Sequence, residues 1–190
     1  MLQELLDELE MPAGAADAHL HHAQPVAAPA AAVWESLTRL QVRNLPLTRT
    51  LVAVRRLEVR PAAMDEPLLT HGPLPLMVSD PPCLAVAAGA GQPWRLRPPR
   101  RRFRSLVEWA SFDEQDWVKT LFAFAIATED PQHCLLSTDT VVWATSSSAR
   151  RRFALYWTAI APFAGLIRRE ILETTARRAV SSQPPADHSG

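Results

Sequence analysis

Cysteine is almost absent from this chain of 190 residues, which contains only Cys83 and Cys134. The two have no CxxC spacing, and their apolar surroundings favour small buried hydrophobes over nucleophiles. The first ten residues carry acidic groups where a secretory signal has a basic end and an apolar run. We therefore expect a cytoplasmic protein in a reducing compartment.

A surplus of either charge is also missing, because Lys and Arg total 20 and Asp and Glu total 20. A balanced chain creates no overall field that attracts nucleic acid or an anionic membrane. Long apolar runs are missing too, since Arg, Pro or Asp interrupts every candidate segment before it could span a bilayer. We expect no nucleic-acid partner and no integral membrane association.

Signatures of the common enzyme classes are absent: there is no Walker loop, dinucleotide glycine fingerprint, HExxH or GxSxG. The histidines allow one alternative. On a strand, His19 and His21 would share one face and His22 the other, so a metal clip completed by His71 or His133 is geometrically feasible. Without Cys, Asp or Glu at ligand spacing, we predict no metal and no cofactor.

Helical patterns dominate the first part of the chain, around one strand. Leucines at helical spacing predict a leader over residues 1–16, a short helix or a flexible segment. His19 to Val26 is expected to be extended, a helix follows Pro29, and a second helix covers Leu45 to Leu57. We expect one domain over residues 17–180 and a disordered tail over 181–190.

Strand and turn patterns follow from Gly72 onward. Short strands are predicted around 74–78 and 84–90, then an exposed basic loop over 94–104, where consecutive prolines stop regular sheet. Extended segments over 106–111, 117–128 and 133–144 predict an antiparallel meander. Which face of 118–126 meets a helix stays open, because one face is bulky and the other small.

The last element, Ala149 to Ala179, predicts a long amphipathic helix. Apolar residues recur every three or four positions, while the arginines, Arg168 among them, lie largely off that line. Pro162 and Gly165 predict a kink or break near Ala161. Carboxylates of the 113–116 turn are expected to offset the arginines at the start of the helix.

Several packing motifs resemble one known superfamily. They are Val26-Ala27-Ala28-Pro29 with Val33-Trp34, Leu136 to Thr140, and Arg151-Arg152-Phe153 with Tyr156-Trp157. In these the chain resembles an uncharacterised bacterial branch of the START and Bet v 1-like superfamily, also called SRPBCC or polyketide cyclase/dehydrase-like. The resemblance implies an α+β helix-grip fold, with two short helices after the first strand and a curved antiparallel sheet wrapped on a long C-terminal helix.

The same resemblance implies a cavity between the sheet and the last helix that binds an apolar molecule, lipid-like, polyketide-like or isoprenoid-like. Aromatic side chains supply rigid apolar surface, although each can equally be core. The candidate ligand-binding residues are Trp94, Trp109, Phe122, Phe124, Trp143, Tyr156, Trp157, Ile160, Phe163 and Ile167.

Two other functions remain open. A cyclase or dehydratase would use Asp139, Lys119 or Tyr156 to move a proton in the same pocket. Lys119, the single lysine, lies on a small apolar strand face where desolvation would lower its pKa, while a surface ion pair with an arginine competes as an interpretation of Asp139. An interaction module would instead have a filled core and dock a partner through the loop Arg95 to Arg104 or through the acidic leader helix.

Overall fold

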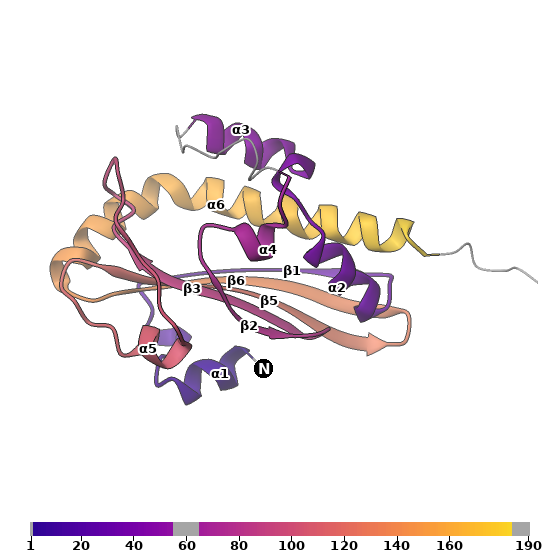
Figure 1. Ribbon diagram of the computed structural model, residues 1–190, viewed down its shortest axis with the longest axis horizontal. Coiled ribbons are helices and arrows are strands. Elements are labelled where there is room, and N and C mark those ends of the chain that lie inside the picture. Colours follow the sequence, from indigo (N-terminus) through magenta and orange to yellow (C-terminus); the bar gives the residue numbers. More distant parts are fainter. Residues whose placement is uncertain (1, 55–64, 184–190) are drawn as a thin grey trace, which may run out of the picture.

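The structure is a computed structural model that describes residues 2–54 and 65–183. A six-stranded antiparallel sheet runs in the order β1-β6-β5-β3-β2, with β4 paired to β3 at one end. A long helix, α6, crosses one face (Figure 1). The strands are β1 (Ala18–Val26), β2 (Leu76–Asp80), β3 (Leu84–Gly91), β4 (Arg100–Arg101), β5 (Val118–Asp130) and β6 (His133–Ala144).

Alternation along the strands separates two apolar layers. Phe124 of β5 and Leu136 of β6 belong to a cluster shared with α6, so their side of the sheet is called the inner face. Leu121 of β5 and Val141 of β6 belong to a cluster on the opposite, outer face. The bulky face of β5 is therefore the one that meets the last helix.

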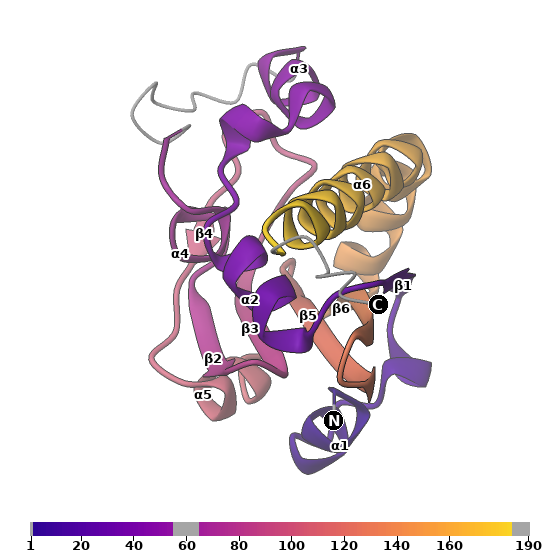
Figure 2. The same ribbon diagram turned by 90° about the vertical axis from the view of Figure 1, so that its right-hand side faces the viewer.

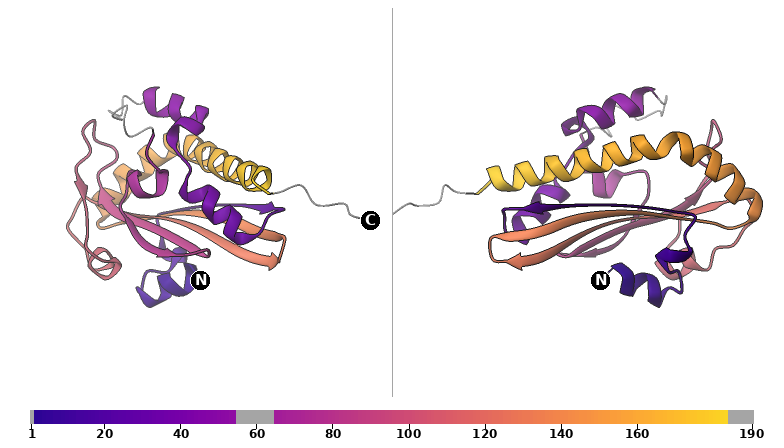
Figure 3. Two further views of the ribbon diagram at one scale, coloured as in Figure 1. Left: turned by 45° about the vertical axis from the view of Figure 1, so that its right-hand side comes forward. Right: turned by 180° about the vertical axis from the view of Figure 1, so that it is seen from behind.

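Helix α6 (Ser147–Ser181) is one continuous helix of 35 residues. The Ser146 hydroxyl accepts a hydrogen bond from the backbone amide of Ala149 and caps its start. Near that end Arg152 pairs with Asp116, as expected of the 113–116 turn, and Arg150 pairs with Asp17. Of the kink or break predicted near Ala161, the break does not occur, because Pro162 lies inside one continuous helix. The ribbon does bend in the N-terminal half of that helix (Figure 3).

Two short helices cover the outer face, α1 (Leu2–Glu8) and α5 (Leu106–Ala110) (Figure 2). The extended segment predicted over 106–111 is wrong, because a helix capped by Ser105 starts there. The Ser105 hydroxyl accepts from the backbone amide of Glu108, and the Glu108 carboxylate accepts from the amide of Arg104. The indole of Trp109 is then fully buried and donates to the Gly89 carbonyl at 2.9 Å.

The remaining helices lie on the side of α6: α2 (Ala30–Thr38), α3 (Pro46–Val54) and α4 (Leu68–His71), with 3-10 turns at Ala13–Ala15 and Val42–Asn44. Pro29 precedes α2 as expected. The predicted second helix corresponds to α3, although its last expected residue, Leu57, lies outside the described residues. These elements complete an α+β helix-grip fold, the fold that the resemblance implied.

A single carboxylate of α6 holds the start of α3. Glu170 accepts from the backbone amides of Leu47 and Thr48 at 2.7 and 2.8 Å and from the Thr48 hydroxyl at 2.6 Å. The first amides of a helix have no partner within that helix, so this contact satisfies donors that would otherwise lack one. It fixes α3 against the face of α6 that points away from the sheet (Figure 1).

Replacing Glu170 with alanine is expected to release α3 without unfolding the sheet. The loss leaves the buried Thr48 hydroxyl unpaired and should cost about 1–3 kcal/mol. Hydrogen exchange would show faster exchange confined to the amides of α3. The control is Glu173→Ala, an exposed carboxylate on the next turn, and equal exchange of α3 in both variants would contradict the account.

Candidate functional site

The middle of α6 is less buried than either end. Phe153 near the start is 3% exposed, and Ile171, Leu172 and Ala179 toward the end are at most 2% exposed. Between them, every residue from Ala154 to Glu170 is partly or fully exposed. The helix is therefore packed at both ends and less covered in between.

The sheet beneath the middle of α6 is also incompletely covered. Phe122 and Thr120 lie on the inner face of the central strand β5, and Ala87 pairs with Phe122 from β3. All three are partly exposed, although central strand positions under a helix are ordinarily buried. Together with Ala164 and Arg168 of α6 they are called the open inner face.

Small residues explain why this region stays open. On the inner side of β3, Ala87 pairs with Phe122 and offers only a methyl group to fill the space beside that ring, whereas the neighbouring Gly89 already lies against the side chain of Leu74. On α6 the position one turn before Arg168 is Ala164, which also has little side chain to offer. Larger side chains at Ala87 and Ala164 would fill more of the space between helix and sheet.

The side chain of Arg168 extends from α6 onto the rings of Phe122 and Phe124 on the inner face of the sheet. Its Cζ atom lies 4.0 Å from the ring centre of Phe122 and 5.8 Å from that of Phe124, and its Nε donates to the Thr140 hydroxyl at 3.1 Å. Burial lowers the pKa of Arg168 to about 10. The helical spacing placed this residue off the apolar stripe, but the arginine faces the sheet.

Two polar atoms beside Arg168 lack hydrogen-bond partners among the described residues, the Nε2 atom of His22 and the hydroxyl of Thr138. His22 and Thr138 are paired across β1 and β6, and both lie on the inner face. Burial, together with the charges of Arg169, His21 and Arg168, lowers the pKa of His22. Hydrogen-bonding atoms thus gather under the helix, and no sequence pattern indicated this cluster.

The predicted ligand-binding residues divide between the two faces. Phe122, Phe124 and Trp157 lie between sheet and helix, and Trp157 stacks on Phe153 with ring centres 5.5 Å apart. Trp109 and Trp143 belong to the outer-face cluster and cannot line a cavity under α6. Phe163 is 45% exposed. The others are partly exposed: Trp94, Tyr156, Ile160 and Ile167.

The three proton-transfer candidates do not meet in one site. Asp139 and Lys119 lie on the outer face, whereas Tyr156 is on α6. Asp139 pairs with histidines rather than with an arginine: its Oδ1 lies 2.7 Å from His19 Nε2 and 2.9 Å from His21 Nδ1. The strand faces predicted for these histidines are correct, but Asp139 was not foreseen as their partner.

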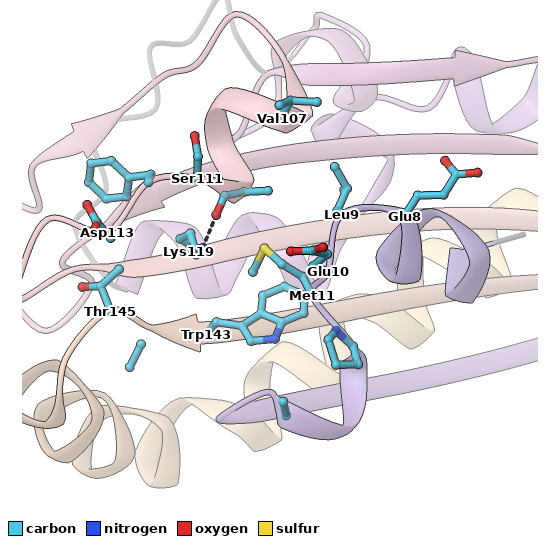
Figure 4. Close-up of a pocket in the computed structure, with 15 residues that line it drawn as sticks. Glu8, Leu9, Glu10, Met11, Val107, Ser111, Asp113, Lys119, Trp143 and Thr145 are labelled. Carbon is cyan, nitrogen blue, oxygen red and sulfur yellow. Dashed lines mark hydrogen bonds between the residues drawn. The ribbon is translucent and has the colours of Figure 1, made fainter.

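A depression of about 560 Å³ lies on the outer face between α1 and α5 (Figure 4). Lys119 lines it and donates to the Ala110 carbonyl at 2.6 Å, and its Nζ is 5.8 Å from the ring centre of Trp109. Trp143 lines it as well, with a buried indole N–H that has no partner among the described residues. A second depression, of about 610 Å³, lies between α4 and β2. Neither is lined by a residue of α6.

Lys119 should titrate below the ordinary lysine value of 10.5. Burial lowers its pKa, as expected from its place on an apolar strand face, and the charge of Asp113 partly opposes the shift. Between the lowered pKa of the folded chain and the ordinary value of the unfolded chain, the unfolded chain holds this proton and the folded chain has lost it. The free energy of unfolding should therefore rise with pH across that interval. Because lysine occurs once, ¹³C-dimethylation gives one side-chain NMR signal to follow.

The Asp113→Asn variant provides the control for that titration, because losing the opposing charge should lower the pKa of Lys119 further. A midpoint at or above 10.5 in the parent protein would show that the side chain is solvated.

The other chemical features of the described residues are simpler. No group of three His, Cys, Asp or Glu residues in the described ranges is placed to hold a metal ion. No described helix is long and apolar enough to cross a membrane.

Cys134 is buried in β6, and burial raises the pKa of its thiol, whereas Cys83 lies in the turn before β3. In the basic loop Arg101 pairs with Glu114, and β4 forms just after the prolines.

Comparison with known proteins yields solved structures only, since no family model and no curated protein matches the chain. A protein of Thermus thermophilus is 9% identical with a TM-score of 0.36, covering 88% of this chain and 100% of that one. The Zhui aromatase/cyclase of a Streptomyces species is 13% identical (TM-score 0.29; 85% and 94% covered). A Thermobifida fusca protein is 15% identical (0.31; 87% and 95%). Likenesses this distant say nothing of what the chain binds.

Proposed function

We propose that the protein binds or carries an apolar small molecule, lipid-like, polyketide-like or isoprenoid-like, between the inner face of the sheet and the middle of α6. One observation carries the proposal: the open inner face is partly exposed although it lies at the centre of the fold. Accessible apolar surface beside the ring of Phe122 favours binding of an apolar ligand. Because both ends of α6 are packed, the helix and the inner face of the sheet are held in place on either side of this site.

A proton-transferring enzyme receives less support, because Asp139 and Lys119 lie on the face opposite Tyr156. General acid–base catalysis needs groups within hydrogen-bond reach of one substrate. Unchanged binding in Asp139→Asn and Lys119→Met is expected, since neither residue borders the open inner face. The interaction module has no distinct support either, since the arginines of the basic loop are exposed and one pairs within the chain.

Titration with N-phenyl-1-naphthylamine, a neutral probe that fluoresces in apolar surroundings, tests the proposal. We expect saturable binding at one site and displacement by long-chain alcohols. Native mass spectrometry of the purified protein gives an independent check for an apolar molecule retained from the cell. Absence of saturable fluorescence and of displacement across a panel of apolar compounds would contradict the proposed function.

A further inference from the structure

A charged group without a counter-ion lies against the open inner face. The guanidinium of Arg168 stacks over Phe122 and approaches Phe124, and within the described residues no carboxylate lies within 4 Å of it. Glu170, the nearest acid in the helix, directs both carboxylate oxygens to the start of α3. A positive charge that has lost part of its hydration is costly unless it is paired.

The free donors of Arg168 have a defined geometry. The Nε–H is already directed to the Thr140 hydroxyl, so the hydrogens on the two Nη atoms remain available for another acceptor. A planar pair of N–H donors matches the two oxygens of a carboxylate better than it matches a single neutral oxygen. Thr140 and the stacking on Phe122 hold the guanidinium plane in a fixed orientation.

The polar atoms near Arg168 also favour an anionic oxygen. The Thr138 hydroxyl and the Nε2 atom of His22 are buried without partners in the described chain, and they face each other across β1 and β6. A hydroxyl donates readily to an oxygen anion, and neutral imidazole can donate from either nitrogen.

We infer that the ligand of the open inner face carries a carboxylate, which pairs with Arg168 while the apolar remainder lies along Phe122 and the middle of α6. The inference rests on the proposed function and narrows its ligand to amphiphiles with an acidic end. It assigns Arg168 as the residue that selects them. Neutral lipids of equal length bind through the apolar part alone.

Displacement of N-phenyl-1-naphthylamine by dodecanoate and by dodecanol, compared at one pH above 7, tests the inference. We expect dodecanoate to bind roughly 10- to 100-fold more tightly than dodecanol, because a charge-assisted pair is added. Arg168→Met should remove that preference, so that dodecanoate then binds no more tightly than dodecanol. Arg168→Lys should keep part of it, since the charge remains and the paired donors are lost.

Arg169→Met is the matched control, because it removes the same charge from the adjacent, exposed position. It should leave the preference within about threefold of the parent value. Equal displacement by acid and alcohol in the parent protein would overturn the carboxylate inference and leave the proposed function standing. Failure of the parent to bind the probe or either amphiphile would overturn both. If Arg168→Met does not fold, the parent ratio and Arg168→Lys decide the question.

Discussion

Replacing Ala164 with phenylalanine is expected to lower the affinity for N-phenyl-1-naphthylamine at least roughly tenfold, while the free energy of unfolding stays within about 1 kcal/mol of the parent value. Ala164 lies one turn before Arg168 and is partly exposed over the open inner face. A benzyl group there should occupy the space that the ligand needs. Probe titration and urea unfolding provide the two measurements.

The stability result separates an open interior from a filled one. Adding a large side chain to a well-packed core costs about 1–3 kcal/mol, whereas filling accessible apolar space costs little. Ala159→Phe is the matched control, because Ala159 lies on the same helix and is exposed. Strong destabilisation by Ala164→Phe with unchanged probe affinity would show that the core is filled, as the interaction-module alternative requires.

Replacing Trp109 with alanine is expected to lower the free energy of unfolding by about 3–5 kcal/mol. The indole is fully buried, packs edge-on to Trp143 with ring centres 5.7 Å apart, and donates to the Gly89 carbonyl. Truncation leaves a cavity in the outer-face cluster and removes the indole donor from the Gly89 carbonyl. Urea unfolding measures the loss.

We expect Trp109→Ala to lower stability without changing the affinity for the probe. Val107→Ala on the same short helix is the control, because Val107 is 70% exposed and its truncation should change stability by less than about 0.5 kcal/mol. Where Trp109→Ala remains folded at low temperature, its probe affinity should equal that of the parent. Lost affinity in a folded Trp109→Ala protein would place the ligand on the outer face.

Periodicity in the sequence predicted the elements whose burial pattern is strong. The aromatic and β-branched residues of β5 and β6 predicted those strands, and apolar residues at every third or fourth position predicted α6, because both patterns are typical of segments that pack against the rest of a fold. Residues 106–111 were assigned to a strand because aromatic and β-branched residues suggested one. The capping pair Ser105 and Glu108 outweighed that signal and made a helix.

The site was predicted less well than the fold, because its members come from separate elements. Trp109 and Trp143 carry the same apolar rings as Trp157, but helix α5 places Trp109 on the outer face and the register of β6 places Trp143 there. Arg168 looked like one of many solvated arginines, since sequence spacing does not say where a bent helix directs one polar side chain. Asp139 and His19 lie 120 residues apart in the chain and meet through strand pairing.

Photo-crosslinking tests the central claim most directly, namely that an apolar molecule binds between the inner face and the middle of α6. Dodecanol with a diazirine in its chain would be irradiated with the protein, and the modified peptides identified by mass spectrometry. We predict adducts within 156–167 of α6 and within 118–126 of β5, lost when unlabelled dodecanol is in excess. Adducts confined to 8–15 and 107–113, which border the outer-face depression, would contradict the account.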